Sequence, residues 1–310
     1  MLQNVFLVSL FMLFLGCQNS ESKQSSQKKI ENHAHWSQAQ LPHKVVHAKA
    51  VGDYFTLFND LNYTKKSWQS GIHLVPRVYL DDIPESWQKN AGKLEVKKKK
   101  ELFFRLLAPL ILRANEKIEA QRSALYDNKL SKAALLELAR RYKVLSKEDQ
   151  NLSKTQLEVL KKRVDTIPVS LALAQGAQES GWGTSRFAIL GNSLFGQWDF
   201  SGKGMAPEQQ RKELGNYGLA RFDKPQDAVD AYMLNLNTHR AYKKLRDLRA
   251  SLRKEGKAVT GLALAGTLDK YSERGEAYVK ELRSLIRYNK LDAADDAILD
   301  KNEVITIVAH

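Results

Sequence analysis

The sequence predicts a mainly α-helical protein with a small β element, an α+β fold. Apolar residues recur at spacings of three and four from about residue 97 onward, which is the period of helices that bury one face. Residues that cap helices stand at the starts of several of these stretches. The segment 190–222 is rich in glycine and aromatic residues and breaks the helical period, so it is the one place where we expect strands.

Composition and charge limit the class of protein before any motif is considered. The chain has 310 residues, enough for one or two domains, and its 43% apolar and 27% charged residues are ordinary for a globular protein. The net charge of +14 suits an anionic partner such as nucleic acid, acidic lipid or an acidic wall polymer. A single cysteine excludes an internal disulfide and a Cys/His zinc site. The sequence has no GxGxxG, P-loop or HExxH motif, and we expect no cofactor or metal.

The amino terminus indicates export. Residues 1–16 contain no charged side chain, and their apolar run from Val5 to Leu15 is too short to cross a bilayer but typical of a signal peptide. Cys17 follows directly, in a pattern that resembles a bacterial lipoprotein signal, where this cysteine is lipidated and becomes the mature N-terminus. Gln18 resembles the residue that sorts such proteins to the outer membrane. We therefore expect an envelope lipoprotein that faces the periplasm and is held to the membrane by a lipid anchor, with an ordinary secretory peptide as the alternative. Export argues against a nucleic-acid partner.

Two regions separate the signal from the helical part of the chain. The polar, low-complexity stretch 17–35 predicts a flexible tether. Residues 36–95 contain scattered aromatic and turn residues without a clear period, and we expect them to form an extended arm packed on a helical body. At the other end, 291–310 is expected to be a tail.

Helices then follow in order. The first is expected from about Lys97, within a helical extension that covers 96–165. A second begins after Ser131, an N-cap residue, and a third after Ser153, where Gln156 completes a capping box. Further helices are predicted at 168–180, 227–238, 241–255, 258–270 and 276–288.

Two basic clusters fall on these helices. One is the run Lys97 to Lys100 at the start of the first helix. The other lies along or next to 241–255 and comprises Arg240, Lys243, Lys244, Arg246 and Arg249. A solvated helix face is the default interpretation of both. Contact with acidic lipid is the alternative for both, and contact with peptide-stem carboxylates is a further alternative for the second.

Glu179 is the residue whose position suggests chemistry. On the helix predicted at 168–180, Ala172, Gly176 and Glu179 follow at i, i+4 and i+7, so two small residues share the face of the acid. Gln175 precedes Glu179 by one turn and points the same way. Small residues on this face allow another backbone or a ligand to approach closely.

The end of this helix gives Glu179 an unusual electrostatic setting. The helix should stop at Gly181 or Gly183, so Glu179 lies in the last turn, where the macrodipole disfavours a negative charge. Trp182 and the small apolar neighbours would also desolvate the carboxylate. Both effects favour the protonated acid, which glycoside cleavage needs to protonate the leaving oxygen. A glutamate simply exposed to solvent is the alternative interpretation.

Several motifs resemble one known family. Around Glu179 they are Ala174-Gln175, Glu179-Ser180-Gly181-Trp182-Gly183 and Asn192-Ser193-Leu194-Phe195-Gly196, and elsewhere they lie at 75–80, 102–104, 115–118, 235–242 and 271–278. Together they resemble the bacterial glucosaminidase family of lysozyme-like peptidoglycan hydrolases, in its Bax-like branch. The resemblance implies a lysozyme-like helical domain with a small β-lobe, here a catalytic domain at 166–290. It also implies cleavage of the β-1,4 bond after N-acetylglucosamine in peptidoglycan glycan strands.

The resemblance assigns roles to individual residues. Glu179 matches the family's general acid, and Tyr271 matches a tyrosine that faces the cleft. Where the family has a second Glu near Phe222, this chain has Tyr217-Gly218, so Glu213, or else Glu208, is the candidate second carboxylate. Residues expected to line the cleft, form its turn or stack on sugars are Gln175, Trp182, Asn192, Phe195 and Trp198.

The mechanism follows from that second carboxylate. If Glu213 or Glu208 comes within about 6.5–9.5 Å of Glu179, it could activate water and invert the anomeric centre. Without it, the N-acetyl group of the substrate could attack while Tyr271 stabilises the cyclic ion, and this is the route we favour. A lytic transglycosylase and a non-catalytic glycan-binding lipoprotein are the rival functions.

Overall fold

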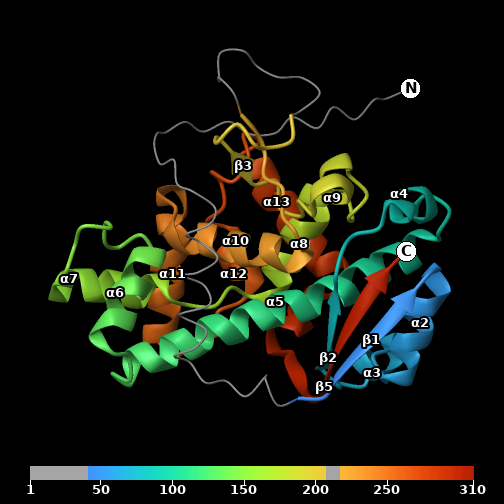
Figure 1. The fold of residues 1–310 in the computed structure, drawn as a ribbon, viewed down its shortest axis with the longest axis horizontal. Helices are drawn as coiled ribbons and strands as arrows, with labels where there is room; N and C mark the ends of the chain where they lie inside the picture. The colour runs from blue at the N-terminus through green and yellow to red at the C-terminus, as the bar shows by residue number, and fades with distance from the viewer. Residues whose placement is uncertain (1–40, 207–216) are drawn as a thin grey trace. The chain divides into compact units, whose positions relative to one another are not determined.

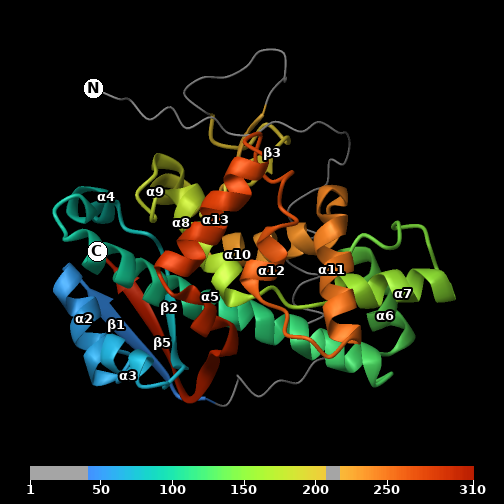
Figure 2. The same cartoon turned by 180° about the vertical axis from the view of Figure 1, so that it is seen from behind.

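The structure is a computed structural model that describes residues 41–206 and 217–310 (Figures 1 and 2). Four predictions lie outside the described residues. They are the signal peptide 1–16, the lipidation site Cys17, the tether 17–35, and Glu213 with its neighbour Glu208.

The described residues form two compact units. We call them the helical unit, Ile118–Thr166 with Leu234–Lys290, and the sheet unit, which comprises 41–117, Ile167–Met233 and Leu291–His310. Helix α5 (Val96–Tyr126) and helix α10 (Pro225–Thr238) contribute residues to both units. The predicted helical extension 96–165 and the predicted catalytic domain 166–290 are likewise each divided between the two.

The sheet unit contains a three-stranded parallel sheet in the order β1-β5-β2 (Figure 1). Its strands are β1 (His43–Ala48), β2 (Leu74–Leu80) and β5 (Ile298–Ala309). Both outer strands pair with the middle one, and His43 and Arg77 share the partner Val304. The prediction that strands occur only in 190–222 is therefore wrong. Instead, the residues expected as an arm and a tail pair with each other. The prediction missed this because a parallel sheet joins segments that are distant in sequence, and local periodicity does not reveal such pairing.

The sheet unit also contains the helix that carries Glu179 and several shorter elements. This helix is α8 (Val169–Ser180), and the others are α2 (Val51–Asp60), α3 (Lys65–Gln69), α4 (Glu85–Ala91), α9 (Arg186–Gly191), the 3₁₀ helix η4 (Leu291–Asp296) and a β-lobe of β3 (Trp198–Asp199) and β4 (Gly218–Leu219). Helices α2 to α4 lie within the predicted arm and were missed, although Thr64 caps α3 by accepting a bond from Ser67 N. The small β element predicted in 190–222 is confirmed by the β3–β4 pair.

The helical unit contains the predicted helices, but the one expected at 258–270 is shorter and spans only Gly261–Ala265. It contains α6 (Lys132–Arg141), α7 (Lys154–Arg163), the 3₁₀ helix η3 (Arg240–Tyr242), α11 (Lys243–Lys254), α12 (Gly261–Ala265) and α13 (Glu276–Tyr288). Ser131 caps α6 by accepting a bond from Ala134 N, and Ser153 forms the predicted capping box with Gln156. These caps satisfy backbone N–H groups that have no partner within the helix.

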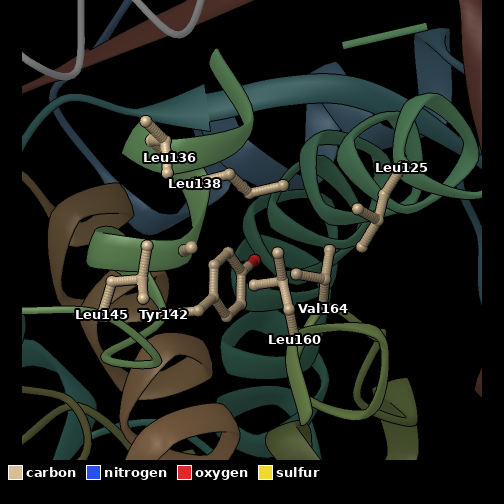
Figure 3. Close-up of a cluster of buried hydrophobic side chains, with 8 residues drawn as sticks. Leu125, Leu136, Leu138, Tyr142, Leu145, Leu160 and Val164 are labelled. Atoms are coloured by element: carbon tan, nitrogen blue, oxygen red, sulfur yellow. The ribbon is translucent and has the colours of Figure 1, made fainter. Parts of the chain in front are cut away.

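A hydrophobic cluster holds the end of α5, α6 and α7 together (Figure 3). Leu138, Tyr142 and Leu160 are at most 2% exposed. The ring of Tyr142 lies beside Leu145, Leu160 and Val164 in Figure 3, and its hydroxyl donates to Gln121 Oε1 at 2.9 Å. The cluster therefore buries an aromatic ring while its polar atom stays paired.

A buried ion cluster also stabilises this unit. Asp165 is 3% exposed and contacts Arg253 at 2.7 Å, Arg249 at 3.3 Å and Arg122 at 3.5 Å. Burial lowers the pKa of Arg249 to about 10, and this guanidinium also donates to the carbonyls of Lys162 and Thr166. One carboxylate thus neutralises part of the charge of three arginines.

The default interpretation of the second basic cluster as a solvated face is wrong for two of its members. Arg249 is fully buried and Arg246 is buried, and Arg246 donates to the carbonyls of Leu236 and His239. Both side chains bind carbonyls that follow or end neighbouring helices, where cations are favoured. Helical spacing identified the arginines, but it could not show which elements pack over them.

We expect Asp165→Asn to destabilise the protein by about 3–5 kcal/mol, because removing one partner of a buried ion cluster leaves uncompensated charge. Urea unfolding followed by circular dichroism measures the loss. Asp247→Asn is the matched control, since Asp247 pairs with Lys162 and Lys243 at the surface and should change the free energy of unfolding by under about 1 kcal/mol. Equal effects of the two substitutions would contradict the assignment.

Candidate functional site

Glu179 lies in the last turn of α8, as predicted. Gly181 ends the helix in the left-handed conformation, with φ of 57°, and Glu179 is half-buried. Its carboxylate approaches a second glycine, because a Cβ atom added to Gly196 would lie 3.5 Å from Glu179 Oε2. Gly196 also has a positive φ of 60°, which a glycine adopts at little cost. The acid therefore faces the backbone of the turn 192–196 and is not surrounded by bulk water.

The first nine residues of α8, 169–177, are buried on all sides. A Cβ atom on Gly176 would lie 2.7 Å from Leu107 Cδ2 and 3.3 Å from Phe195 Cε1, so any larger residue would force these side chains to shift. Gln175 is fully buried, and its Oε1 accepts a bond from the Tyr232 hydroxyl at 2.7 Å. The close approach expected on this face is thus made by side chains of the core, and Gln175 is anchored one turn before the acid.

A polar cap holds the other end of α8. Pro168 precedes the helix and makes no side-chain cap bond. Instead Asp295 of η4 accepts bonds from Ser170 N and Ser170 Oγ, both at 2.8 Å. A carboxylate at a helix N-terminus is favourable, so α8 is fixed at its start by charge and along its length by packing.

The turn after Glu179 is tied to α4 and α5. Ser180 Oγ donates to Gly176 O at 2.5 Å and accepts from Gly183 N at 2.8 Å, which closes the turn. The Trp87 indole N–H donates to Trp182 O at 3.3 Å. Residues 180–183 are therefore held from within and from α4.

Trp182 packs against the first part of α5. Its ring meets Phe103 and Phe104 edge to face, with centroids 5.8 and 5.2 Å away, and Lys100 Nζ lies 4.7 Å from its centre. Trp182 as a whole is half-buried, and its predicted role in substrate binding stays a prediction.

Asn192 and Phe195 make contacts that position the turn beside Glu179. Asn192 is buried, adopts a positive φ of 50°, accepts a bond from Ile83 N and donates to Phe222 O, both at 3.2 Å. Phe195 is 1% exposed and stacks on Tyr232 with centroids 4.0 Å apart. Both residues thus lie where they support the turn, with little of either surface open to a ligand.

The β-lobe begins directly after Gly196. Trp198 pairs with Leu219 across β3 and β4, and its half-buried ring lies 5.0 Å from that of Tyr217. Asp199 is the described carboxylate of this lobe, and its two oxygens accept bonds from Ser201 N and Ser201 Oγ. Asp199 therefore stabilises a turn.

Tyr271 belongs to the helical unit, whereas Glu179 belongs to the sheet unit. Its half-buried ring is stacked on Tyr278, with centroids 5.6 Å apart, and is tilted on Tyr242 at 5.7 Å. A row of three tyrosines thus fixes the orientation of the ring within its own unit.

An apolar cavity of about 60 Å³ lies in the sheet unit. Its lining includes Trp87, Leu102, Phe103, Leu106 and Gly183, but not Glu179. Within the described ranges no cluster of three or more metal-binding side chains occurs, and no helix there has the length and apolar character to cross a membrane.

Three residues that sequence reasoning missed contribute to the site. Trp87, Tyr232 and Asp295 bind Trp182, Gln175 and the start of α8 respectively. Each is distant in sequence from its partner, so no spacing rule connects them. A signal existed only for Asp295, as an acid in a segment rich in acids.

Comparison with known proteins connects this geometry to a family. A family profile described as mannosyl-glycoprotein endo-beta-N-acetylglucosaminidase matches residues 154–291, a range that includes Glu179 and Tyr271. Protein bax of Escherichia coli (strain K12) is 36% identical over 199 residues, which cover 62% of this chain and 70% of that protein. The comparison with solved structures found no match.

Proposed function

Because the chain belongs to the glucosaminidase family, as a Bax-like member, we propose that it hydrolyses peptidoglycan at the β-1,4 bond after N-acetylglucosamine, with Glu179 as general acid. Membership of the family makes the chain a peptidoglycan-related glycosidase in general. The observation that supports the finer proposal is the half-buried carboxylate of Glu179, at the C-terminal end of α8 and against the backbone at Gly196.

The setting of Glu179 suits an acid that gives up a proton. The carbonyl end of α8 and partial burial both disfavour the charged carboxylate. As the bond between the glycosidic oxygen and the sugar breaks, negative charge develops on that oxygen, and Glu179 donates a proton to it. Gly196 leaves room beside the carboxylate that a side chain would fill.

Two routes complete the reaction. In the substrate-assisted route, which we favour, the N-acetyl oxygen attacks the anomeric carbon, Tyr271 stabilises the cyclic ion, and water then opens it with retention. In the other, Glu213 takes a proton from water, which attacks directly with inversion. Asp199 is already bound to Ser201, so Glu213 or Glu208 remains the candidate base of the second route.

The expected envelope location completes the proposal. We infer that residues 1–16 are removed and that Cys17 carries a lipid, so that the enzyme acts on the wall from the outer membrane. This inference rests on the sequence pattern of residues 1–17.

Glu179→Gln should lower the release of reducing ends from purified peptidoglycan by about 10²–10⁴-fold, because the amide cannot donate the proton. A thermal midpoint equal to that of the wild type would show that the fold of the variant is intact. Glu158→Gln is the control, since Glu158 is 69% exposed and pairs only at the surface of α7. Full activity of the Glu179 variant would reject the assignment.

The same assay separates the two rival functions. Wall binding without any cleavage by the wild type would favour the glycan-binding lipoprotein. Products with an anhydro end would identify a lytic transglycosylase.

The substrate-assisted route predicts a retained anomer in the first product formed. Proton NMR during cleavage of a defined muropeptide distinguishes the two anomers before they equilibrate. An inverted product would exclude this route and assign the water-activating role to a carboxylate such as Glu213.

Cys17→Ser should prevent lipidation and release the protein from the membrane fraction. Mass spectrometry of the mature protein tests this directly, because a lipid-modified cysteine at its N-terminus is expected. A mature protein that begins elsewhere, without acyl mass, would show an ordinary secretory signal.

A further inference from the structure

A dense group of lysines occupies α4, the loop after it and the start of α5, and one of them, Lys100, contacts Trp182 of the candidate site. Six lysines occur between Glu85 and Glu101, against three glutamates. We call them the lysine surface: Lys89 in α4, Lys93 in the connecting loop, and Lys97 to Lys100 in the first turns of α5. Lys89, Lys93, Lys97 and Lys98 are exposed, and none of these four pairs with an acid elsewhere in the described part of the chain. Of the three glutamates, Glu101 is already paired with Arg105.

The stability of α5 does not account for these lysines. The first turn of this 31-residue helix contains no acidic residue. Cations at a helix N-terminus oppose the macrodipole, and adjacent lysines repel one another. The cluster therefore weakens the start of the helix, and a role in binding explains its presence better than a role in folding.

The lysine surface is attached to the turn that follows the candidate acid. Lys100 Nζ lies over the ring of Trp182, three residues after Glu179, and Phe104 packs against the same ring. From α4, Trp87 donates to the Trp182 carbonyl. All these residues belong to the sheet unit, so the contact between Lys100 and the turn after Glu179 is made within one unit.

We propose that the lysine surface binds the carboxylates of the peptide stems attached to the glycan strand, so that the preferred substrate is stem-bearing peptidoglycan and not bare glycan. This inference rests on the proposed function. The stems are attached to the glycan strand next to the bond that is cleaved, so their carboxylates are anions close to that bond. Flexible lysine ammonium groups suit such targets because they act as mobile point charges and need no fixed bidentate geometry. Anionic phospholipid could bind the same charges, but contact with the turn after Glu179 favours a ligand that enters the site.

The test compares glycan strands that carry stems with the same strands after an amidase has removed the stems, which leaves a single lactyl carboxylate on each N-acetylmuramic acid. The wild type should cleave the stem-bearing strands with the higher kcat/KM, and added salt should reduce this preference. In Lys97→Glu/Lys98→Glu the ratio of the two kcat/KM values should fall at least about tenfold, mainly through KM, since the interaction is electrostatic positioning.

The matched control is Lys132→Glu/Lys154→Glu. Both lysines are exposed and stand at the first positions of α6 and α7 in the helical unit. Both double variants should raise the thermal midpoint, by about 1–4 °C, because each places acids at helix N-termini. Only the Lys97/Lys98 variant should lose the preference for stems. A fall in its thermal midpoint would show that the lysines serve the fold, and would overturn the proposal.

Failure of this inference differs from failure of the proposed function. If the wild type cleaves both strands equally well, or the Lys97/Lys98 variant keeps the wild-type ratio, the lysine surface does not bind stems although the enzyme is a glucosaminidase. If the wild type cleaves neither strand, the proposed function itself fails. A variant that keeps its ratio but loses binding to phosphatidylglycerol vesicles would assign the surface to lipid.

Discussion

The contact between Gly176 of α8 and Leu107 of α5 is the constraint on which the candidate site depends. Glycine leaves this space free, whereas a Cβ atom at position 176 would lie 2.7 Å from Leu107 Cδ2 and force that side chain to shift. The two helices can therefore pack closely, and Phe195 from the next turn fills the space beside them. Glu179 follows Gly176 by three residues, so its place at the end of α8 is set by packing that occurs one turn earlier.

Both ends of α8 are held by parts of the chain that are distant in sequence. Asp295 binds the start, while Trp87 and the Phe103–Phe104 pair hold the turn that follows the end. The site thus depends on α4, α5 and η4 as well as on the residues near Glu179. A catalytic group needs this kind of support, because its geometry is only as precise as the residues that surround it.

Local signals predicted a large part of the structure. Ser131 and Ser153 marked two helix starts correctly, and Gly181 predicted that Glu179 lies in the last turn of its helix, because caps act within a few residues. The parallel sheet could not be predicted in this way, since β1 and β2 are short and their partner is β5. Burial of Arg249 was also missed, because helical period locates a face but does not show what covers it. In the site, the helix face on which Glu179 lies could be predicted from residue spacing. The approach of Glu179 to Gly196 could not, because it depends on tertiary packing.

The position of β5 has a consequence for how the protein folds. Strands β1 and β2 do not pair with each other in the sheet. Each pairs there with β5, which follows all the described helices in the chain, so neither can pair in this way until β5 has been made. Closing a loop this long between two strands is slow, because the chain loses conformational entropy before the strand contacts form. While synthesis proceeds, the early part of the sheet unit keeps open strand edges, and Ser170 lacks Asp295 until the same late segment arrives. The helix bearing Glu179 can thus reach its final anchored form only when the last residues of the chain have joined the sheet unit.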